Sequence, residues 1–175
     1  PDPRTPVQLD RALPQLSWGL IVSTAEWADM VLGDLEVFSL ADRPDLAAAF
    51  WAVEGDWPIF MLMDPVAHRR YEAAAELYPD LHLCGVLDGQ VVARLHSVPI
   101  DPAAVLDLPE RGWDWALETG VDQRREDRAA ISLIEARISP AHRGRGLSGR
   151  LLAAALTHFR RLGASDVVGP VRPTS

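Results

Sequence analysis

Hydrophobic residues recur along the chain with two spacings, and these spacings predict its secondary structure. Alternation of apolar and polar residues is typical of strands with one buried face, whereas a period near 3.6 is typical of amphipathic helices. Alternating or continuously apolar runs predict strands at residues 36–40, 81–87, 90–98, 130–138 and 166–171. The helical spacing predicts helices at residues 45–53, 65–77 and 146–162.

Turn-forming residues separate these elements and give their order. Asp88-Gly89 lies between two alternating runs and predicts a two-residue hairpin turn. The run 130–138 is almost entirely apolar, as expected for a central strand covered on both faces. The order of strand, helix, helix, three strands, helix and strand predicts an α/β fold of the α+β kind, with a mixed sheet.

Two segments depart from this pattern. Four prolines within the first 14 residues indicate that residues 1–33 form an N-terminal extension, with a short helix at 25–32. Residues 34–175 are then one domain, in which residues 99–129 form an insertion with a helix at 111–119. A connection of this length is more often elaborated for binding or assembly than idle.

Composition restricts the class of protein and localises its charge. A chain of 175 residues suits one domain with a sizeable core. Its net charge of −8 argues against a nucleic-acid-binding or membrane-surface protein, because both need a basic face. Residues 1–128 hold 10 arginines and 23 acidic residues, whereas residues 129–175 hold 7 arginines and 2 acidic residues. Positive charge is therefore concentrated in the last quarter of the chain.

Missing residue types exclude several kinds of chemistry. Every basic residue is arginine, so a lysine nucleophile or Schiff base is excluded. Cys84 is the sole cysteine and lies in an apolar run, which predicts a buried thiol, no intrachain disulfide and no cysteine zinc cluster. No metal site is predicted. Apolar runs fall short of the roughly 20 residues of a membrane span, and with no visible signal peptide we expect a cytoplasmic protein.

The most informative stretch is the glycine-rich turn from Ile138 to Ser148, between a predicted strand and a predicted helix. Gly144 and Gly146 allow positive φ and let a ligand approach the backbone closely. Successive amide groups at such a turn can converge on an anion, and the helix dipole reinforces them. Arg143 and Arg145 add attraction for phosphate. The turn is therefore predicted to bind a pyrophosphate group.

Two common phosphate-binding motifs fit this turn poorly. A P-loop requires a Gly-Lys pair, and the chain has no lysine. The stretch Gly144-Arg145-Gly146-Leu147-Ser148-Gly149 matches the Gly-x-Gly-x-x-Gly dinucleotide pattern, with Asp166 near the expected acidic position. That motif normally opens a repeated βαβ sheet, however, and hairpin strands precede it here.

The turn and its setting resemble the GNAT superfamily of acyl-CoA-dependent N-acetyltransferases, whose signature is Gln/Arg-x-x-Gly-x-Gly/Ala at a strand-to-helix turn. Arg143 and Gly146 match this signature, and Ser148 replaces its last residue. The preceding Ile138-Ser139-Pro140 and the order of elements over 36–171 are also similar to the family. The alternative is a structural turn with incidental glycines.

The resemblance implies transfer of an acetyl group from acetyl-CoA to a primary amine of a small molecule or peptide, by direct attack on the thioester. It implies that the pyrophosphate binds the amides of 143–148 and that pantetheine pairs with the strand edge at 136–138. The expected cofactor-binding residues are Ala136, Arg137, Ile138, Arg143, Gly144, Arg145, Gly146, Leu147 and Ser148. Neither a metal, a nucleic acid nor a membrane is expected as a partner, and a homodimer is possible.

The acceptor amine must be neutral to attack, so a base is expected near the thioester. Glu135 in the central strand is the candidate catalytic base, and an ion pair with Arg94 or another strand arginine is its structural alternative. Glu54 and Asp56 follow the first helix and are either acceptor-site residues or solvated loop charge. The histidines have weaker claims: His82 and His96 as packed or surface residues, His142 as a neighbour of phosphate, and His68 and His158 as surface residues.

The acid that protonates the leaving thiolate is missing from the expected place. Many family members use a tyrosine on a helix after the fifth strand, whereas Tyr71 and Tyr78 precede the hairpin here. We therefore expect the C-terminal helix and strands to be absent from this chain. Two alternative functions follow: a non-catalytic acyl-CoA-binding module, or a GNAT-like domain acting on acyl-thioesters of a carrier protein. Acidic residues in the insertion either attract a cationic amine or form a solvated surface: Asp101, Asp107, Glu110, Asp114 and Glu118.

Overall fold

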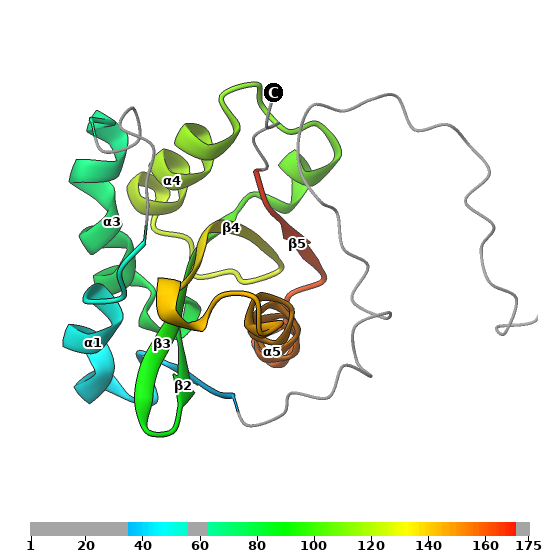
Figure 1. The fold of residues 1–175 in the computed structure, drawn as a ribbon. Helices are drawn as coiled ribbons and strands as arrows, with labels where there is room; N and C mark the ends of the chain where they lie inside the picture. Colours follow the sequence, from blue (N-terminus) through cyan, green and yellow to red (C-terminus); the bar gives the residue numbers. More distant parts are fainter. Residues whose placement is uncertain (1–34, 56–62, 171–175) are drawn as a thin grey trace, which may run out of the picture.

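The computed structural model of the chain describes residues 35–55 and 63–170 (Figure 1). The N-terminal extension, its helix at 25–32 and Asp56 lie outside the described residues, as does the side chain of His68. Within the described part, a single mixed sheet carries helices on both faces. This arrangement confirms the predicted fold class.

The sheet has five strands in the order β1-β2-β3-β4-β5. Its first four strands pair antiparallel, and β5 pairs parallel with β4. The strands are β1 (Glu36–Ser39), β2 (Leu83–Leu87), β3 (Gln90–Ile100), β4 (Ala130–Ile138) and β5 (Asp166–Val168). The predicted hairpin is present between β2 and β3, where Asp88 and Gly89 have φ values of 51° and 76°.

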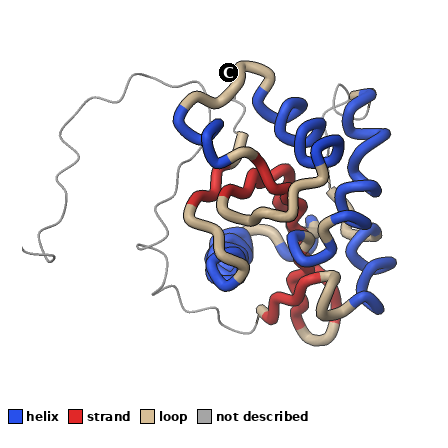
Figure 2. Tube along the Cα trace, turned by 180° about the vertical axis from the view of Figure 1, so that it is seen from behind, coloured by secondary structure: helices blue, strands red, loops and turns tan. Residues whose placement is uncertain are grey.

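Within the described ranges, helix α5 covers one face of the sheet, and α1, α3 and α4 cover the other (Figure 1). The helices are α1 (Ala47–Trp51), α3 (Pro65–Leu77), α4 (Gly112–Gln123) and α5 (Leu147–Arg161). Figure 2, drawn from behind, shows α3 and α4 side by side, in agreement with the many contacts between them. None of the helices in the described ranges has the length and apolar character needed to cross a membrane.

Several predicted boundaries are wrong for identifiable reasons. The predicted helix at 45–53 begins as a 3₁₀ turn at Pro44–Leu46, and only Ala47–Trp51 is α-helical. Another 3₁₀ turn spans Pro79–Leu81, so β2 begins two residues later than predicted. Strand β3 continues through Pro99 to Ile100, because an extended strand accepts the φ of proline and loses only one donor. Strand β5 ends at Val168, where its pairing with β4 ends.

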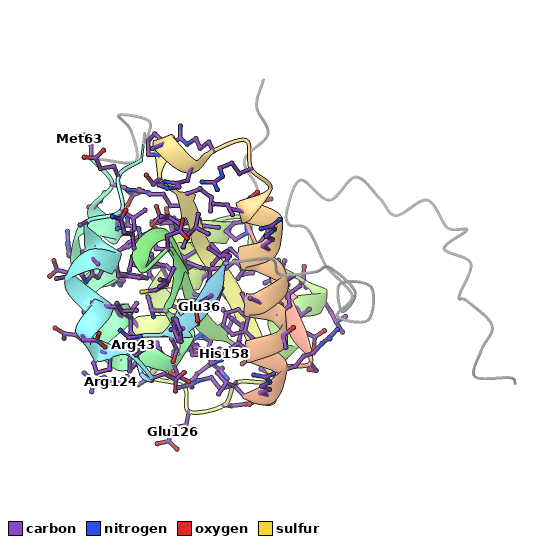
Figure 3. All side chains as sticks on the ribbon, turned by 60° about the horizontal axis from the view of Figure 1, so that its bottom comes forward. Glu36, Arg43, Met63, Arg124, Glu126 and His158 are labelled. Carbon is purple, nitrogen blue, oxygen red and sulfur yellow. The ribbon has the colours of Figure 1, made fainter. Side chains whose placement is uncertain are left out.

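Helix α4 occupies the core position that the sequence analysis described as an insertion. It is longer than predicted and ends at Gln123, where the C-cap residue Arg124 has a φ of 48°. Figure 3 shows Glu126 projecting outward from the following loop. Ala116 and Leu117 are buried. A Cβ on Gly120 would lie 2.6 Å from the Cβ of Val98, so this glycine lets α4 approach β3 closely. Residues 99–129 therefore contribute to the core as well as to the surface.

Candidate active site

A cavity of about 480 Å³ opens between the end of β4 and the start of α5. It is lined by Gly55, Ile134, Glu135, Ala136, Arg137, Ile138, His142, Arg143, Gly144, Gly146, Leu147 and Ser148. The structure thus brings Glu135 and eight of the nine residues predicted to bind a cofactor to one site. Arg145 is the exception, because it is exposed and does not line the cavity.

The edge of β4 becomes available where the two parallel strands diverge. Strand β5 pairs with β4 only at Ala130, Ile131 and Ser132, whereas β3 pairs with β4 as far as Ile138. The edge of residues 133–138 that would face β5 therefore has no strand partner within the described residues. Free backbone groups of this kind can pair with an extended amide-containing ligand.

A bulge in β4 lies beside this edge. The register between β3 and β4 shifts so that His96 faces Glu135 and Ser97 faces Leu133, which leaves Ile134 as the extra residue. The indole nitrogen of Trp113, on α4, donates to the carbonyl oxygen of Ile134 at 2.9 Å. Helix α4 thereby satisfies the carbonyl that the bulge takes out of the ladder. No local sequence pattern predicts this contact, because it depends on tertiary packing.

The turn into α5 has the geometry of an anion-binding backbone. Gly144 and Gly146 have φ values of 74° and 71°, and a Cβ on either would meet nothing within 4 Å. Gly146 is the N-cap of α5, and no side chain caps the first amides of the helix. Open space therefore lies beside a helix N-terminus whose N–H groups lack intrahelical acceptors. These residues fit a pyrophosphate group.

Glu135 takes part in a buried network of charges. Arg94 donates to its Oε2 at 3.1 Å, and Arg137 donates to its Oε1 at 2.5 Å. The side chains of Glu135 and Arg94 are only 6% and 8% exposed. Burial raises the pKa of Glu135 while the two guanidinium groups oppose that shift, and burial lowers the pKa of Arg137. The structure therefore contains the ion pair that was the alternative to a catalytic base.

Both arginines also bind the segment that follows α1. Arg94 donates to the carbonyl oxygens of Phe50 and Trp51, at 3.4 and 3.3 Å. Arg137 donates to the carbonyl oxygen of Val53 at 3.3 Å. Carbonyl groups at a helix C-terminus lack intrahelical donors and attract cations. Arg94 and Arg137 thus attach the end of α1 to the sheet through hydrogen bonds.

Two buried histidines lie behind this network. His96 has its Nε2 3.6 Å from Glu135 Oε2, and its ring packs 4.9 Å from that of His82. His82 pairs with the Tyr78 carbonyl through Nδ1 at 2.8 Å. Burial lowers the pKa of His82 to about 4 and that of His96 well below its usual range. Both are packed residues, which was one of the two predicted outcomes.

The remaining candidates occupy other positions. His142 lines the cavity, whereas Glu54 is exposed and His158 contacts the Asp80 carbonyl.

Tyr78 donates to the Gly120 carbonyl at 2.6 Å, and burial raises the pKa of Tyr71. Neither tyrosine lines the cavity. Cys84 is buried as predicted, and burial raises the pKa of its thiol to about 12.

The acidic residues of 99–129 do not line the cavity. Asp101 pairs with Arg125 at 2.5 Å, and Glu118 pairs with Arg111 at 2.8 Å. Among the residues that the structure describes, the charged ones that line it are Glu135, Arg137 and Arg143. The hypothesis that these acidic residues attract a cationic amine into the cavity is therefore not supported by their positions. No group of three or more His, Cys, Asp or Glu side chains in the described ranges could hold a metal.

The chain is similar in sequence to a curated acetyltransferase. No protein-family model matches the chain. The arginine N-acetyltransferase avaD of Aspergillus versicolor is 25% identical over 150 residues, which cover 77% of this chain. The match covers 51% of the relative, so the chain spans about half the length of that protein.

The chain is also similar to several solved structures. The loading GNATL domain of CurA from Lyngbya majuscula has a TM-score of 0.46 and 20% identity, covering 77% of this chain and 63% of that one. A GNAT family acetyltransferase from Brucella melitensis, in complex with acetyl-CoA, has a TM-score of 0.42 and 18% identity, covering 77% and 74%. The sequence match to avaD, the strand order and the diverging edge beside a glycine-rich turn together identify a GNAT superfamily fold.

Proposed function

We propose that the chain is an acyltransferase that moves an acetyl group from acetyl-CoA to a primary amine. The observation that carries this proposal is the cavity in which open-sided glycines at a helix N-terminus lie beside a strand edge with no described strand partner. A phosphate-bearing ligand with an extended amide arm needs both features. The match to an arginine N-acetyltransferase supports the same assignment.

In this proposal each part of the cavity has a distinct task. The amides of residues 143–148 hold the pyrophosphate, and Arg143 adds a favourable field. The backbone of residues 136–138 pairs with the pantetheine arm and aligns the thioester. The thioester supplies an activated acyl carbon: the amine nitrogen bonds to that carbon, the carbon–sulfur bond breaks, the sulfur takes up a proton and the amine loses one.

The residues that line the cavity differ in whether they can accept a proton from the amine. Both carboxylate oxygens of Glu135 already accept from Arg94 and Arg137, so a proton taken from the amine would have to displace one of these bonds. His142 lines the cavity and is accessible from it. Loss of a proton from the amine to bulk water, directly or through His142, is the assignment we favour.

The proposal is tested by mixing acetyl-CoA with a panel of primary amines and measuring released CoA thiol. The panel contains arginine, other amino acids, polyamines and peptides with free N-termini. We expect acetyl-CoA to bind in calorimetry and at least one amine to release thiol. Binding without release across the panel would contradict transfer to amines and favour a binding module. Release of thiol from an acetylated acyl carrier protein, with none from acetyl-CoA, would favour the carrier-protein alternative. No binding of any CoA ester would contradict the acyltransferase, the binding module and the carrier-protein alternative together.

A further inference from the structure

Arg137 belongs to both sides of the cavity. Its backbone lies in the part of β4 whose edge has no described strand partner, and its side chain crosses to the segment after α1. We propose that Arg137 is a positioning residue that fixes residues 53–55 as the acceptor-side wall of the cavity, with Glu135 orienting its guanidinium group. This inference rests on the proposed function only in assigning this wall to the acceptor. The contacts of Arg137 are independent of that function.

Arg137 contacts residues 53–55 through one hydrogen bond and through close packing against Gly55. Its Nη1 donates to the Val53 carbonyl oxygen at 3.3 Å. A Cβ on Gly55 would lie 2.6 Å from Cδ and 2.8 Å from Nε of Arg137. Only a residue without a side chain lets the arginine lie this close. Gly55 lines the cavity together with Arg137, so the packed pair forms part of the wall.

Glu135 provides the orientation. Arg94 and Arg137 are direct partners across the antiparallel pair of β3 and β4, so two cations face each other on one side of the sheet. Like charges in such a position repel unless an anion separates them. The Glu135 carboxylate accepts from Arg94 at both oxygens and from Arg137 at Oε1, and it directs both guanidinium groups toward carbonyls at and just after the end of α1. Its position in the cavity wall thus follows from a positioning role, without proton transfer.

Substitution of Arg137 tests the proposal. Arg137→Met keeps the length of the aliphatic chain and removes the donors, Arg137→Lys keeps a cation, and Arg161→Met is a control at an exposed arginine on α5. Three quantities are measured: acetyl-CoA affinity by calorimetry, hydrogen exchange of peptides covering 47–55, and KM and kcat for an amine that the wild type acetylates.

For Arg137→Met we expect exchange at 50–55 to accelerate about tenfold, because the anchoring bond is lost. Acetyl-CoA affinity should change less than about threefold, because backbone groups carry that contact. The amine KM should rise about tenfold with a smaller change in kcat, as expected when a substrate wall is displaced. Arg137→Lys should recover part of both effects, and Arg161→Met should show neither.

The proposal is overturned if exchange at 50–55 and the amine KM are both unchanged in Arg137→Met. It is also overturned if Glu135→Gln abolishes kcat with unchanged KM and removes an acidic limb from the pH profile, since that is the behaviour of a base. If the methionine variant does not fold, the lysine variant supplies the same comparison. If the wild type acetylates no amine, the proposed function fails separately, and the exchange measurement still decides whether Arg137 fixes residues 53–55.

Discussion

Arginine residues occupy opposite settings on the two sides of the cavity. In the turn before α5, Arg143 is exposed, and the backbone of Gly144 and Gly146 provides the geometry. Beneath α1, Arg94 and Arg137 are largely shielded from solvent and bonded to Glu135. Exposed arginines contribute a long-range field that salt screens, whereas buried ones must be paired and then fix neighbouring atoms. One side of the cavity is thus open to a ligand, whereas on the other side Glu135 and backbone carbonyls hold the two guanidinium groups in place.

Removal of Glu135 should have the largest effect, because it leaves two buried cations without their anion. We expect Glu135→Ala to lower the free energy of unfolding by about 3–5 kcal/mol. Urea denaturation measures this change. The control is Asp45→Ala, which breaks the exposed pair between Arg43 and Asp45 and should cost nothing measurable. Equal losses in the two variants would contradict the distinction between the buried and exposed arginines.

Acid should destabilise the fold through the two buried histidines behind the Glu135 network. His82 and His96 have pKa values below their usual range, near 4 for His82, because burial disfavours the charged ring. The unfolded chain binds protons below pH 6.5 that the folded chain does not, so stability falls as pH decreases from about 6.5 to 4. Each histidine contributes about 1.4 kcal/mol per pH unit in that window.

Urea denaturation between pH 7.5 and 4.5 measures this dependence. His82→Asn keeps a donor near the Tyr78 carbonyl and removes the titrating ring. The variant should therefore show a shallower loss of stability with acid than the wild type. Equal slopes would mean that the ring of His82 is accessible to protons in the folded state.

The turn before α5 is tested by Gly146→Asp. A side chain at φ 71° and a negative charge would enter the proposed pyrophosphate site, and we expect acetyl-CoA affinity to fall about 100-fold or more. Calorimetry measures the affinity. The matched control is Gly89→Asp in the hairpin turn, where φ is 76° and a Cβ also meets nothing. It carries the same backbone strain and should bind normally, so an equal loss in both variants would remove the site from the turn.

The sequence predicted the open side of the cavity better than the buried side. Glycines at 144 and 146 determine the local backbone by their own conformational freedom, so their role is visible without tertiary information. The same holds for Asp88-Gly89 and for the helix at Pro65–Leu77, whose N-cap Asp64 accepts from two amides.

The buried side depends on register, which local patterns do not specify. Arg94 and Arg137 become neighbours only because a bulge at Ile134 and the pairing of β3 with β4 place them opposite each other. The close contact of Gly55 with Arg137 depends on where α1 ends, which the local sequence does not specify. Trp113 likewise finds its carbonyl partner through the packing of α4. The sequence did show Arg94 and Glu135 in two predicted strands. This observation was compatible both with a catalytic base and with an ion pair, so it did not decide the role of Glu135.

The smallest expected effect is that of Arg143→Ala. If backbone amides hold the pyrophosphate and Arg143 supplies mainly a field, acetyl-CoA affinity should fall about threefold to tenfold at low salt. That loss should shrink as the salt concentration rises, because screening weakens the field in the wild type as well. Calorimetry at 50 and 500 mM salt, with Arg161→Ala as an exposed control, measures both quantities. A loss as large as that of Gly146→Asp, unchanged by salt, would show that Arg143 makes a short, directed contact, and the two sides of the cavity would then use arginine alike.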